Sequence, residues 1–361
     1  MSERQRGAVV SQPVSSAAAG PLAGIRILEV GTMLAGPYAT MMLADLGAEV
    51  TKIEPPIGEI SRQVGDSYFA SLNRGKRSIR LELASTAGQR RLAELVAQSH
   101  ALLVNLKPSA IRRLGLTYDS LRQFNERIVC VAITGFGLDG GDDPAFDYVI
   151  QAAVGIAAMT GDPEGPPTLP GYSSADNSTG LTAALGLLAQ IVSGRGGQVD
   201  VSLYEVMLSQ LNYHASAYLN DGKQPLRRKF GAHSYYVPAQ LFPTANGHLA
   251  LFITHDGFWK VFAAEAGIDG FGTMAERAAH RDDVLAAVAA ALATDTASSW
   301  ESRLRPLGIP AAAVRTLPEA LATTPETVVT VGDFRLIRSP IRIAGYQPQY
   351  SPPPVLGQHE P

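Results

Sequence analysis

A strand, a short turn, a helix and a second strand follow one another near the start of this chain. Residues 25–30 are apolar and β-prone and predict a strand. A glycine-bounded turn follows, and Pro37 suits the first position of a helix that Gly47 would end in a left-handed conformation. Residues 48–53 predict the second strand. Because such a unit places its two strands in parallel with a helix outside them, we expect an α/β fold built on a parallel sheet.

The alternation continues to about residue 204 and then changes character. Further strands are predicted over residues 77–83, 101–104, 128–133 and 198–203, and helices over 87–97, near Ile111 and Leu121, and over 147–158 and 180–192. Residues 205–219 predict one long helix. After it, strands over 235–242 and 248–254 flank an Asn246-Gly247 turn, and several helices extend to about residue 306.

These patterns predict two domains and a tail. Residues 1–20 are expected to form a flexible N-terminal tail, because they combine small residues with no apolar segment. The large domain is expected to comprise residues 21–204 and 326–361, with residues 205–220 as a linker helix and residues 221–325 as a smaller α+β domain.

Composition excludes several classes of protein. The 361 residues carry a formal net charge of −3, so no basic excess indicates nucleic acid. The single cysteine, Cys130, excludes a disulfide framework, and the seven histidines show no metal-ligand spacing, so no metal is expected. No apolar segment approaches the roughly 18 residues of a membrane span, and residues 1–20 lack a signal core. We therefore expect a cytoplasmic protein with no membrane partner.

The loop Gly31–Gly36 is a candidate binding site, because it precedes a helix. Helix N-termini offer free N–H groups and a partial positive charge, which suit phosphate or carboxylate. A tight turn without a ligand is the alternative. The loop lacks the dinucleotide and Walker glycine patterns. Glu54, at a strand end, keeps a nicotinamide-binding site open as a weak alternative.

Two short basic runs are candidates for phosphate binding. One contains Arg74 and Lys76, and the other contains Lys107, Arg112 and Arg113. Ligands of doubly wound sheets bind outside the carboxyl ends of the strands, where we expect the second run to lie. Solvated surface charge is the alternative for both.

Asp176 lies between small residues and the predicted helix over 180–192. An aspartate in that position commonly caps a helix. An exposed, oriented carboxylate with small neighbours can also act as a nucleophile. The residues alone leave both roles open.

Ordered sequence blocks resemble the class III CoA-transferases of the formyl-CoA and carnitine type, a family that also contains α-methylacyl-CoA racemases. The resemblance covers about residues 21–360, and its blocks lie at residues 27–30, 34–40, 43–54, 73–78, 135–137, 147–152, 195–202 and 353–359. It implies a Rossmann-like large domain, a small domain and an interlocked homodimer. It also implies that Asp176, followed four residues later by Gly180, is the nucleophile.

The implied reaction moves CoA from an acyl-CoA donor to a carboxylic acid acceptor. Asp176 would attack the thioester carbonyl to give a mixed anhydride and CoA thiolate, and the thiolate would then form an aspartyl-CoA thioester. Acyl-CoA and carboxylic acids are thus the expected partners, and no tightly bound cofactor is expected. The residues that the resemblance places at CoA are Met33, Leu34, Ala35, Arg74, Lys76, Asn105, Arg113, Gly135 and Phe136.

This chain departs from the family pattern at several positions. Leu34 stands where formyl-CoA enzymes have glutamine, which together with Met33 and Phe136 suggests an apolar acyl group. Phe146 and His255 stand where racemases have their acid–base pair, which favours a transferase over a racemase. A nicotinamide oxidoreductase and a non-catalytic CoA-binding protein are the remaining alternatives.

Overall fold

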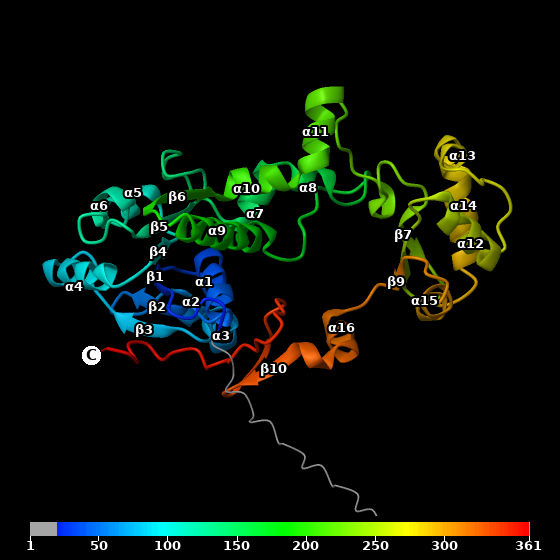
Figure 1. Cartoon of the computed structure of the whole chain (residues 1–361). Helices are drawn as coiled ribbons and strands as arrows, with labels where there is room; N and C mark the ends of the chain where they lie inside the picture. The colour runs from blue at the N-terminus through cyan, green and yellow to red at the C-terminus, as the bar shows by residue number, and fades with distance from the viewer. Residues whose placement is uncertain (1–19, 361) are drawn as a thin grey trace, which may run out of the picture. The chain divides into compact units, whose positions relative to one another are not determined.

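Six parallel strands form the sheet of the first part of the chain (Figure 1). The computed structural model describes residues 20–360, so the expected flexible tail lies outside the described residues except for Gly20. All six predicted strands are present, with bounds that differ from the predictions by a few residues at most. They are β1 (Arg26–Val30), β2 (Glu49–Glu54), β3 (Arg77–Arg80), β4 (Ala101–Val104), β5 (Val129–Thr134) and β6 (Gly197–Ser202).

The strand order is β3-β2-β1-β4-β5-β6, with every neighbouring pair parallel. This is the doubly wound arrangement, in which the order reverses between β1 and β4. The parallel α/β fold expected from the sequence is therefore confirmed.

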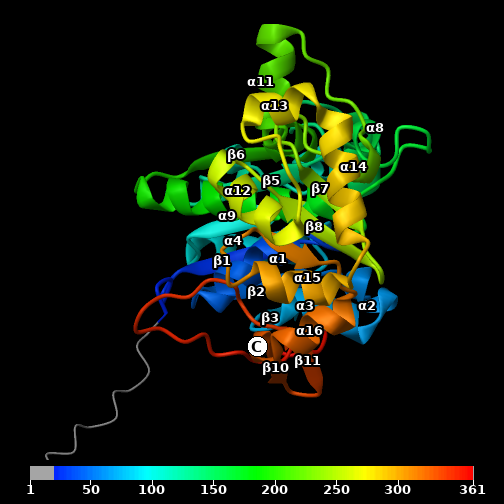
Figure 2. The ribbon, with the colours of Figure 1, turned by 90° about the vertical axis from the view of Figure 1, so that its right-hand side faces the viewer.

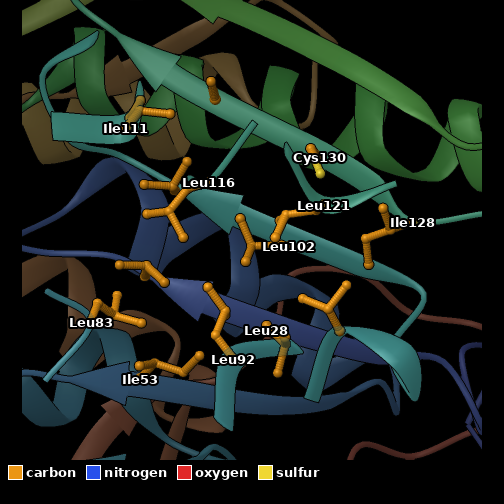
Figure 3. Close-up of a cluster of buried hydrophobic side chains, with 14 of the residues drawn as sticks. Leu28, Ile53, Leu83, Leu92, Leu102, Ile111, Leu116, Leu121, Ile128 and Cys130 are labelled. Carbon is orange, nitrogen blue, oxygen red and sulfur yellow. The ribbon is translucent and has the colours of Figure 1, made fainter. Parts of the chain in front are cut away.

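Helices cover both faces of this sheet. One face carries the main apolar core (Figure 3), in which Leu28, Leu102 and Cys130 from the strands meet Leu92 of α4 and Ile111 of α5. The helices of this part are α1 (Ala35–Asp45), α2 (Ser61–Val64), α3 (Asp66–Asn73), α4 (Thr86–Ala97), α5 (Pro108–Arg113), α6 (Tyr118–Leu121) and α9 (Ser174–Val192).

Several helix bounds correct the predictions. Helix α1 begins at Ala35, so Pro37 is its third residue, where its missing N–H is still harmless. The helix expected over 147–158 is two helices, because Gly155 adopts φ +88° between them. The single helix expected over 205–220 is also two helices, which meet at Leu211. Next to this break the Asn212 side chain accepts from the Tyr213 N–H, a local bond that competes with helix continuation.

The chain divides into two compact units. Among the described residues, the first comprises residues 20–144, 176–203 and 328–360, and the second comprises residues 145–175 and 204–327. The last part of the first unit holds an antiparallel pair, β10 (Val328–Val331) and β11 (Phe334–Ile337). Farther on, His359 exchanges two hydrogen bonds with the Ser78 backbone of edge strand β3.

The second unit has a three-stranded antiparallel sheet in the order β7-β8-β9 and a helical layer, part of which Figure 2 shows. Its apolar core is built around Trp259, Phe262 and Trp300. Its strands are β7 (Ala239–Pro243), β8 (His248–Phe252) and β9 (Ala311–Ala313). Its helices are α7 (Asp147–Ala153), α8 (Ile156–Met159), α10 (Leu203–Gln210, whose first residue belongs to the first unit), α11 (Asn212–Asp221), α12 (Asp256–Ala266), α13 (Met274–Ala279), α14 (Arg281–Leu292), α15 (Ala297–Leu304) and α16 (Leu317–Thr323), with 3-10 turns at Lys229–Gly231 and Pro325–Thr327. Among the described residues, no helix is long and apolar enough to cross a membrane.

Candidate active site

The loop after β1 and the residue after β4 meet where the strand order reverses. The Thr32 N–H donates to Asn105 Oδ1 at 2.8 Å, and Asn105 Nδ2 donates to the Thr32 carbonyl at 2.8 Å. A Cβ on Gly36 would lie 2.7 Å from the same Oδ1, so this approach requires glycine. The structure thus brings Asn105 against the loop that contains Met33 and Leu34. Crevices at such a reversal are the usual ligand sites of doubly wound sheets.

A buried carboxylate holds the same loop from the side of β2. Glu59 Oε2 accepts from Thr32 Oγ1 at 3.1 Å and from the Met33 N–H at 3.2 Å. Met33 adopts φ +60°, a left-handed conformation that residues with a side chain seldom take. Sequence analysis did not identify Glu59 as a site residue, because it precedes the short helix α2, which was not predicted.

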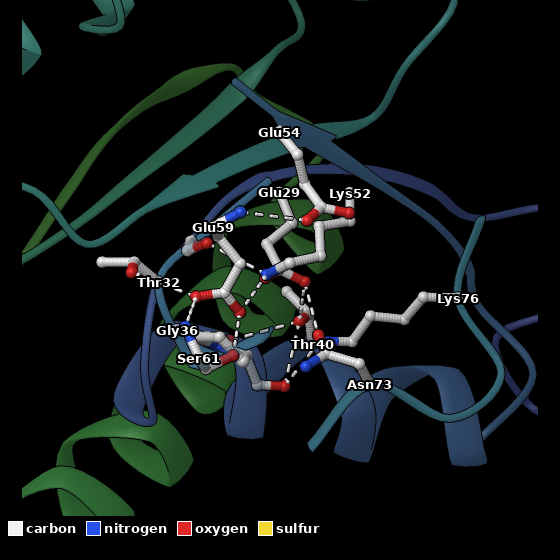
Figure 4. Close-up of polar contacts among 12 residues, drawn as sticks. Glu29, Thr32, Gly36, Thr40, Lys52, Glu54, Glu59, Ser61, Asn73 and Lys76 are labelled. Atoms are coloured by element: carbon white, nitrogen blue, oxygen red, sulfur yellow. Dashed lines mark hydrogen bonds and ion pairs between the residues drawn. The ribbon is translucent and has the colours of Figure 1, made fainter. Parts of the chain in front are cut away.

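Beneath the loop lies a layer of buried charges (Figure 4). Lys52 Nζ lies 2.6 Å from Glu29 Oε1 and 3.3 Å from Glu59 Oε1, and it donates to the Gly31 carbonyl at 3.0 Å. Lys76 Nζ lies 2.8 Å from Glu29 Oε2. The side chains of Glu29, Lys52 and Lys76 are fully buried. We call Glu29, Lys52, Glu59 and Lys76 the buried charge layer.

The charges in this layer set one another's ionisation. Burial by itself raises the pKa of Glu29, but the Lys52 and Lys76 ammonium groups outweigh it and lower that pKa to about 2. Burial lowers the pKa of Lys76 to about 8, since Glu29 offsets the loss of solvation only in part. For Lys52 the carboxylates outweigh burial, and its pKa is raised. Glu29, Lys52 and Lys76 are therefore charged at neutral pH.

Asp176 lies in the first turn of α9 and is partly exposed. The cap alternative for Asp176 is wrong, because α9 begins at Ser174, two residues before Asp176, so the helix extends over residues 174–179 as well as the predicted 180–192. A carboxylate in the first turn still benefits from the helix dipole. Gly180 lies one turn further on the same face, where an added Cβ would be 2.7 Å from the Ala35 carbonyl oxygen of α1. Glycine at this position therefore allows α9 to approach the start of α1 closely.

Tyr68 of α3 is a titratable group near the site that sequence reasoning did not single out. Burial raises the pKa of Tyr68, and the negative charges of Asp176 and Glu59 raise it further. The phenol is therefore within electrostatic range of both carboxylates. Like Glu59, it lies in the segment between β2 and β3 that the sequence left without predicted helices.

Two of the predicted CoA-binding side chains have partners inside the protein. Arg74 donates to Asp45 through Nε at 3.0 Å and Nη2 at 2.6 Å, and both side chains are buried. Lys76 bonds Glu29, the Pro37 carbonyl and Asn73 Oδ1. Both residues thus stabilise the fold beneath the loop, and contact with CoA phosphate stays a prediction.

The remaining predicted residues lie at the carboxyl ends of β4 and β5. Arg113 ends α5 and is exposed. Gly135 and Phe136 directly follow β5 and are partly exposed. A cavity of about 300 Å³ opens at the carboxyl ends of β1 to β4, lined mainly by apolar side chains that include Val30, Ile53, Leu81, Leu83 and Leu106. The edge of the sheet that carries the loop therefore offers space for a ligand.

Other chemistry considered from the sequence has little structural support. Glu54 is fully buried and accepts from Arg62 at 2.6 Å and from Ser78 Oγ at 2.6 Å, so it is engaged within the protein. His255 caps α12 by accepting from the Phe258 N–H at 3.2 Å. Cys130 is buried, and burial raises the pKa of its thiol to about 12. Among residues 20–360, no group of acids, histidines and cysteines is suited to hold a metal ion.

Comparison with known proteins decides the family. The family model described as CoA-transferase family III matches residues 22–360. The chain belongs to CoA-transferase family III. It is 30% identical to the succinate–glutarate CoA-transferase of Agrobacterium fabrum, with 94% of each protein covered. It is also 30% identical to the acetyl-CoA:oxalate CoA-transferase of Acetobacter aceti, with 92% of each covered.

Solved structures agree with this assignment. A CAIB/BAIF family protein from Brucella suis matches with a TM-score of 0.83 and 28% identity, covering 95% of this chain and 98% of the other. Rv3272 from Mycobacterium tuberculosis matches with a TM-score of 0.86 and 28% identity, covering 94% and 98%. The resemblance inferred from the sequence blocks is confirmed, and the protein is a CoA-transferase.

Proposed function

We propose that this protein transfers CoA from an acyl-CoA to a carboxylic acid through covalent intermediates on Asp176. The Asp176 carboxylate attacks the thioester carbonyl, and CoA leaves as a thiolate. The thiolate then attacks the aspartyl carbonyl of the mixed anhydride, which forms the aspartyl-CoA thioester and releases the donor's carboxylate. An acceptor carboxylate enters by the same two steps in reverse. The side-chain carboxyl group thus conserves the energy of the thioester.

The packing of Gly180 against α1 is the observation that best supports this role. Because Gly180 has no side chain, α9 can lie against the first residue of α1, with Asp176 one turn away on the same face. The start of α1 offers backbone N–H groups where negative charge would develop on the attacked carbonyl oxygen. We therefore infer that a glycine four residues after Asp176 lets the nucleophile lie close to the N-terminus of α1.

CoA is expected to lie along the carboxyl ends of the strands. The cavity of about 300 Å³ beside β1 to β4 has apolar walls suited to a purine base. Arg113 and Lys107, both exposed around α5, are suited to its phosphates. Asn105 would then act mainly through the loop, since both ends of its amide bond Thr32.

Leu34 supports an acyl group with an apolar portion. It is the residue immediately before α1, and its side chain is partly exposed. It cannot donate the hydrogen bonds that a glutamine there would offer a second carboxylate. The relatives are named for succinate, glutarate and oxalate, all of them dicarboxylates. A panel of donors and acceptors that includes both dicarboxylic and monocarboxylic acids is therefore the appropriate first assay.

The decisive test replaces Asp176 by asparagine. Asp176→Asn keeps the size of the side chain but removes the nucleophilic oxygen, so transfer should fall by roughly 10³-fold or more. Asp119→Asn, an exposed aspartate on α6, is the matched control and should retain full activity. Transfer is followed by mass spectrometry of the acyl-CoA products. Hydroxylamine added during turnover should form a hydroxamate at Asp176 alone.

Retention of turnover by Asp176→Asn, or a hydroxamate on another residue, would refute the proposal. The interlocked dimer, the domain bounds and the cytoplasmic location remain predictions from the resemblance and the composition.

A further inference from the structure

The backbone between β1 and α1 has a conformation that must be held by its surroundings. Met33 adopts φ +60°, although a residue with a side chain disfavours that region. Left-handed residues of this kind persist where neighbouring groups fix them, and they concentrate at functional sites. The residue lies immediately before Leu34 and α1, at the place where we expect the thioester.

Glu59 supplies the contacts that fix this conformation. Its Oε2 accepts from three donors: the Met33 N–H at 3.2 Å, Thr32 Oγ1 at 3.1 Å and the Ser61 N–H at 3.0 Å. Its Oε1 accepts from Ser61 Oγ and lies 3.3 Å from the Lys52 ammonium group. Only 3% of the side chain is exposed. A carboxylate with both oxygens engaged in this way is a rigid support.

Asn105 holds the other side of the same turn. Its amide exchanges two hydrogen bonds with the Thr32 backbone, each 2.8 Å long. Thr32 and Met33 therefore lie between Glu59, which follows β2, and Asn105, which follows β4. Asn105 does not bond the Met33 N–H, which donates to Glu59. Without Glu59, the Met33 N–H would therefore lose its partner.

We propose that Glu59 is a positioning residue for CoA transfer. It holds Thr32 and Met33 so that the first N–H groups of α1 keep the placement needed to receive the charge of the attacked carbonyl. The proposal rests on the function proposed for Asp176. This role requires a carboxylate at position 59. A glutamine has an NH₂ group in place of one oxygen. In the place of Oε2, that NH₂ could not accept from the three donors there, and in the place of Oε1 it would face the Lys52 ammonium group.

The test compares Glu59→Gln with Glu301→Gln. Glu301 is a matched control, because it is also a buried carboxylate, but it belongs to the second unit and pairs with Arg305 and Arg315. Glu59→Gln should lower kcat by roughly 10- to 100-fold with little change in the KM of the acyl-CoA, because orientation is lost and binding is retained. Glu301→Gln should lower the thermal midpoint and leave both constants unchanged.

Hydrogen exchange of the loop provides a second readout that does not depend on turnover. The amide of Met33 should exchange at least tenfold faster in Glu59→Gln than in the wild type, and at the wild-type rate in Glu301→Gln. Met33→Gly should recover part of the lost kcat when combined with Glu59→Gln, because glycine adopts positive φ freely. The two single variants and the double variant form a cycle that isolates this coupling.

The outcomes separate this proposal from the proposed function. Unchanged loop exchange, or unchanged kcat in an active enzyme, would overturn the positioning role. If the wild type transferred CoA between none of the tested pairs, the proposed function would fail, and the exchange data would still decide whether Glu59 holds the loop.

Discussion

The two faces of the six-stranded sheet differ around β1 and β2, where one face is apolar and the other combines buried charges with apolar side chains such as Ile27 and Val50. On one face, Leu28 of β1 lies beside Leu102 of β4, within a cluster of apolar side chains that α4, α5 and α6 complete. On the other face, over β1 to β3, Glu29 lies beside Lys52 in the same parallel register. Thr40 of α1 donates to Glu29, so α1 covers this charged part of the sheet.

The difference lies in how strictly each face specifies its geometry. Apolar burial is roughly proportional to area and has no direction, so similar side chains can replace one another. A buried charge is stable only when partners surround it at short distances, so the buried charge layer allows few arrangements. The loop that begins with Gly31 lies over the charged face and is bonded to it through Lys52 and Glu59. We infer that the apolar face provides stability and the charged face provides precision at the site.

The largest expected effect follows from removing the central carboxylate of the charged face. Glu29→Gln leaves the buried ammonium groups of Lys52 and Lys76 without their shared counter-charge, which should reduce the free energy of unfolding by about 4 kcal/mol. Turnover per folded molecule should fall as well, because Lys52 also bonds the Gly31 carbonyl. Urea denaturation followed by circular dichroism measures the first effect, and the transfer assay measures the second.

Leu102→Ala is the matched variant on the apolar face. Leu102 is fully buried, and its truncation should reduce the free energy of unfolding by about 3 kcal/mol. Its turnover per folded molecule should match the wild type. Equal losses of turnover in both variants would contradict the division of roles between the two faces.

The next largest expected effect is a loss of stability at acidic pH, caused by Glu29 on the charged face. The pKa of Glu29 is about 2 in the folded protein, against an ordinary value of 4.5. A carboxyl group with a lowered folded pKa stabilises the fold above pH 4.5, and this contribution is lost as the pH falls from 4.5 toward 2. The loss should amount to about 3 kcal/mol.

Denaturation curves between pH 5 and pH 2 measure this loss. Leu102→Ala should retain the same dependence on pH, whereas Glu29→Gln should show a shallower one. If the free energy of unfolding fell equally with pH in Glu29→Gln and in the wild type, the acid sensitivity would belong to other carboxylates.

The sequence predicted the apolar face far better than the charged one. Strands such as β4 are short apolar runs bounded by polar residues, and their bounds match the structure closely. Helices α2 and α3 were not predicted, because neither has a strong apolar periodicity. In the structure, Gly65 separates them with φ +146°. Buried contacts of Phe69 and Leu72 stabilise α3 instead. Glu59 and Tyr68 were missed for the same reason.

The charged face also shows what a local run of basic residues does not reveal. Arg74 and Lys76 were predicted to contact CoA phosphate from a short basic run and a family resemblance. Both are buried and paired within the protein, and their contact with CoA stays a prediction. Their partners, Asp45 and Glu29, lie about 30 to 50 residues earlier in the chain. Only the tertiary fold brings such partners together, so a local pattern cannot identify them. The prediction for Asp176 rests instead on the family resemblance and on a spacing from Gly180 that is local to one helix.

The smallest expected effect on stability concerns the contact of α9 with α1. In Gly180→Ala the new methyl group would lie 2.7 Å from the Ala35 carbonyl oxygen, so the two helices must separate slightly. Overpacking should outweigh the gain in helix propensity, with a net loss of about 1 kcal/mol in the free energy of unfolding.

The same displacement moves Asp176 away from the start of α1, so kcat should fall by roughly 10- to 100-fold. In the control Gly186→Ala, on the same helix, the new methyl group meets only the Val199 side chain, so kcat should stay near the wild-type value. Equal kcat values for the two variants would show that this contact does not position the nucleophile.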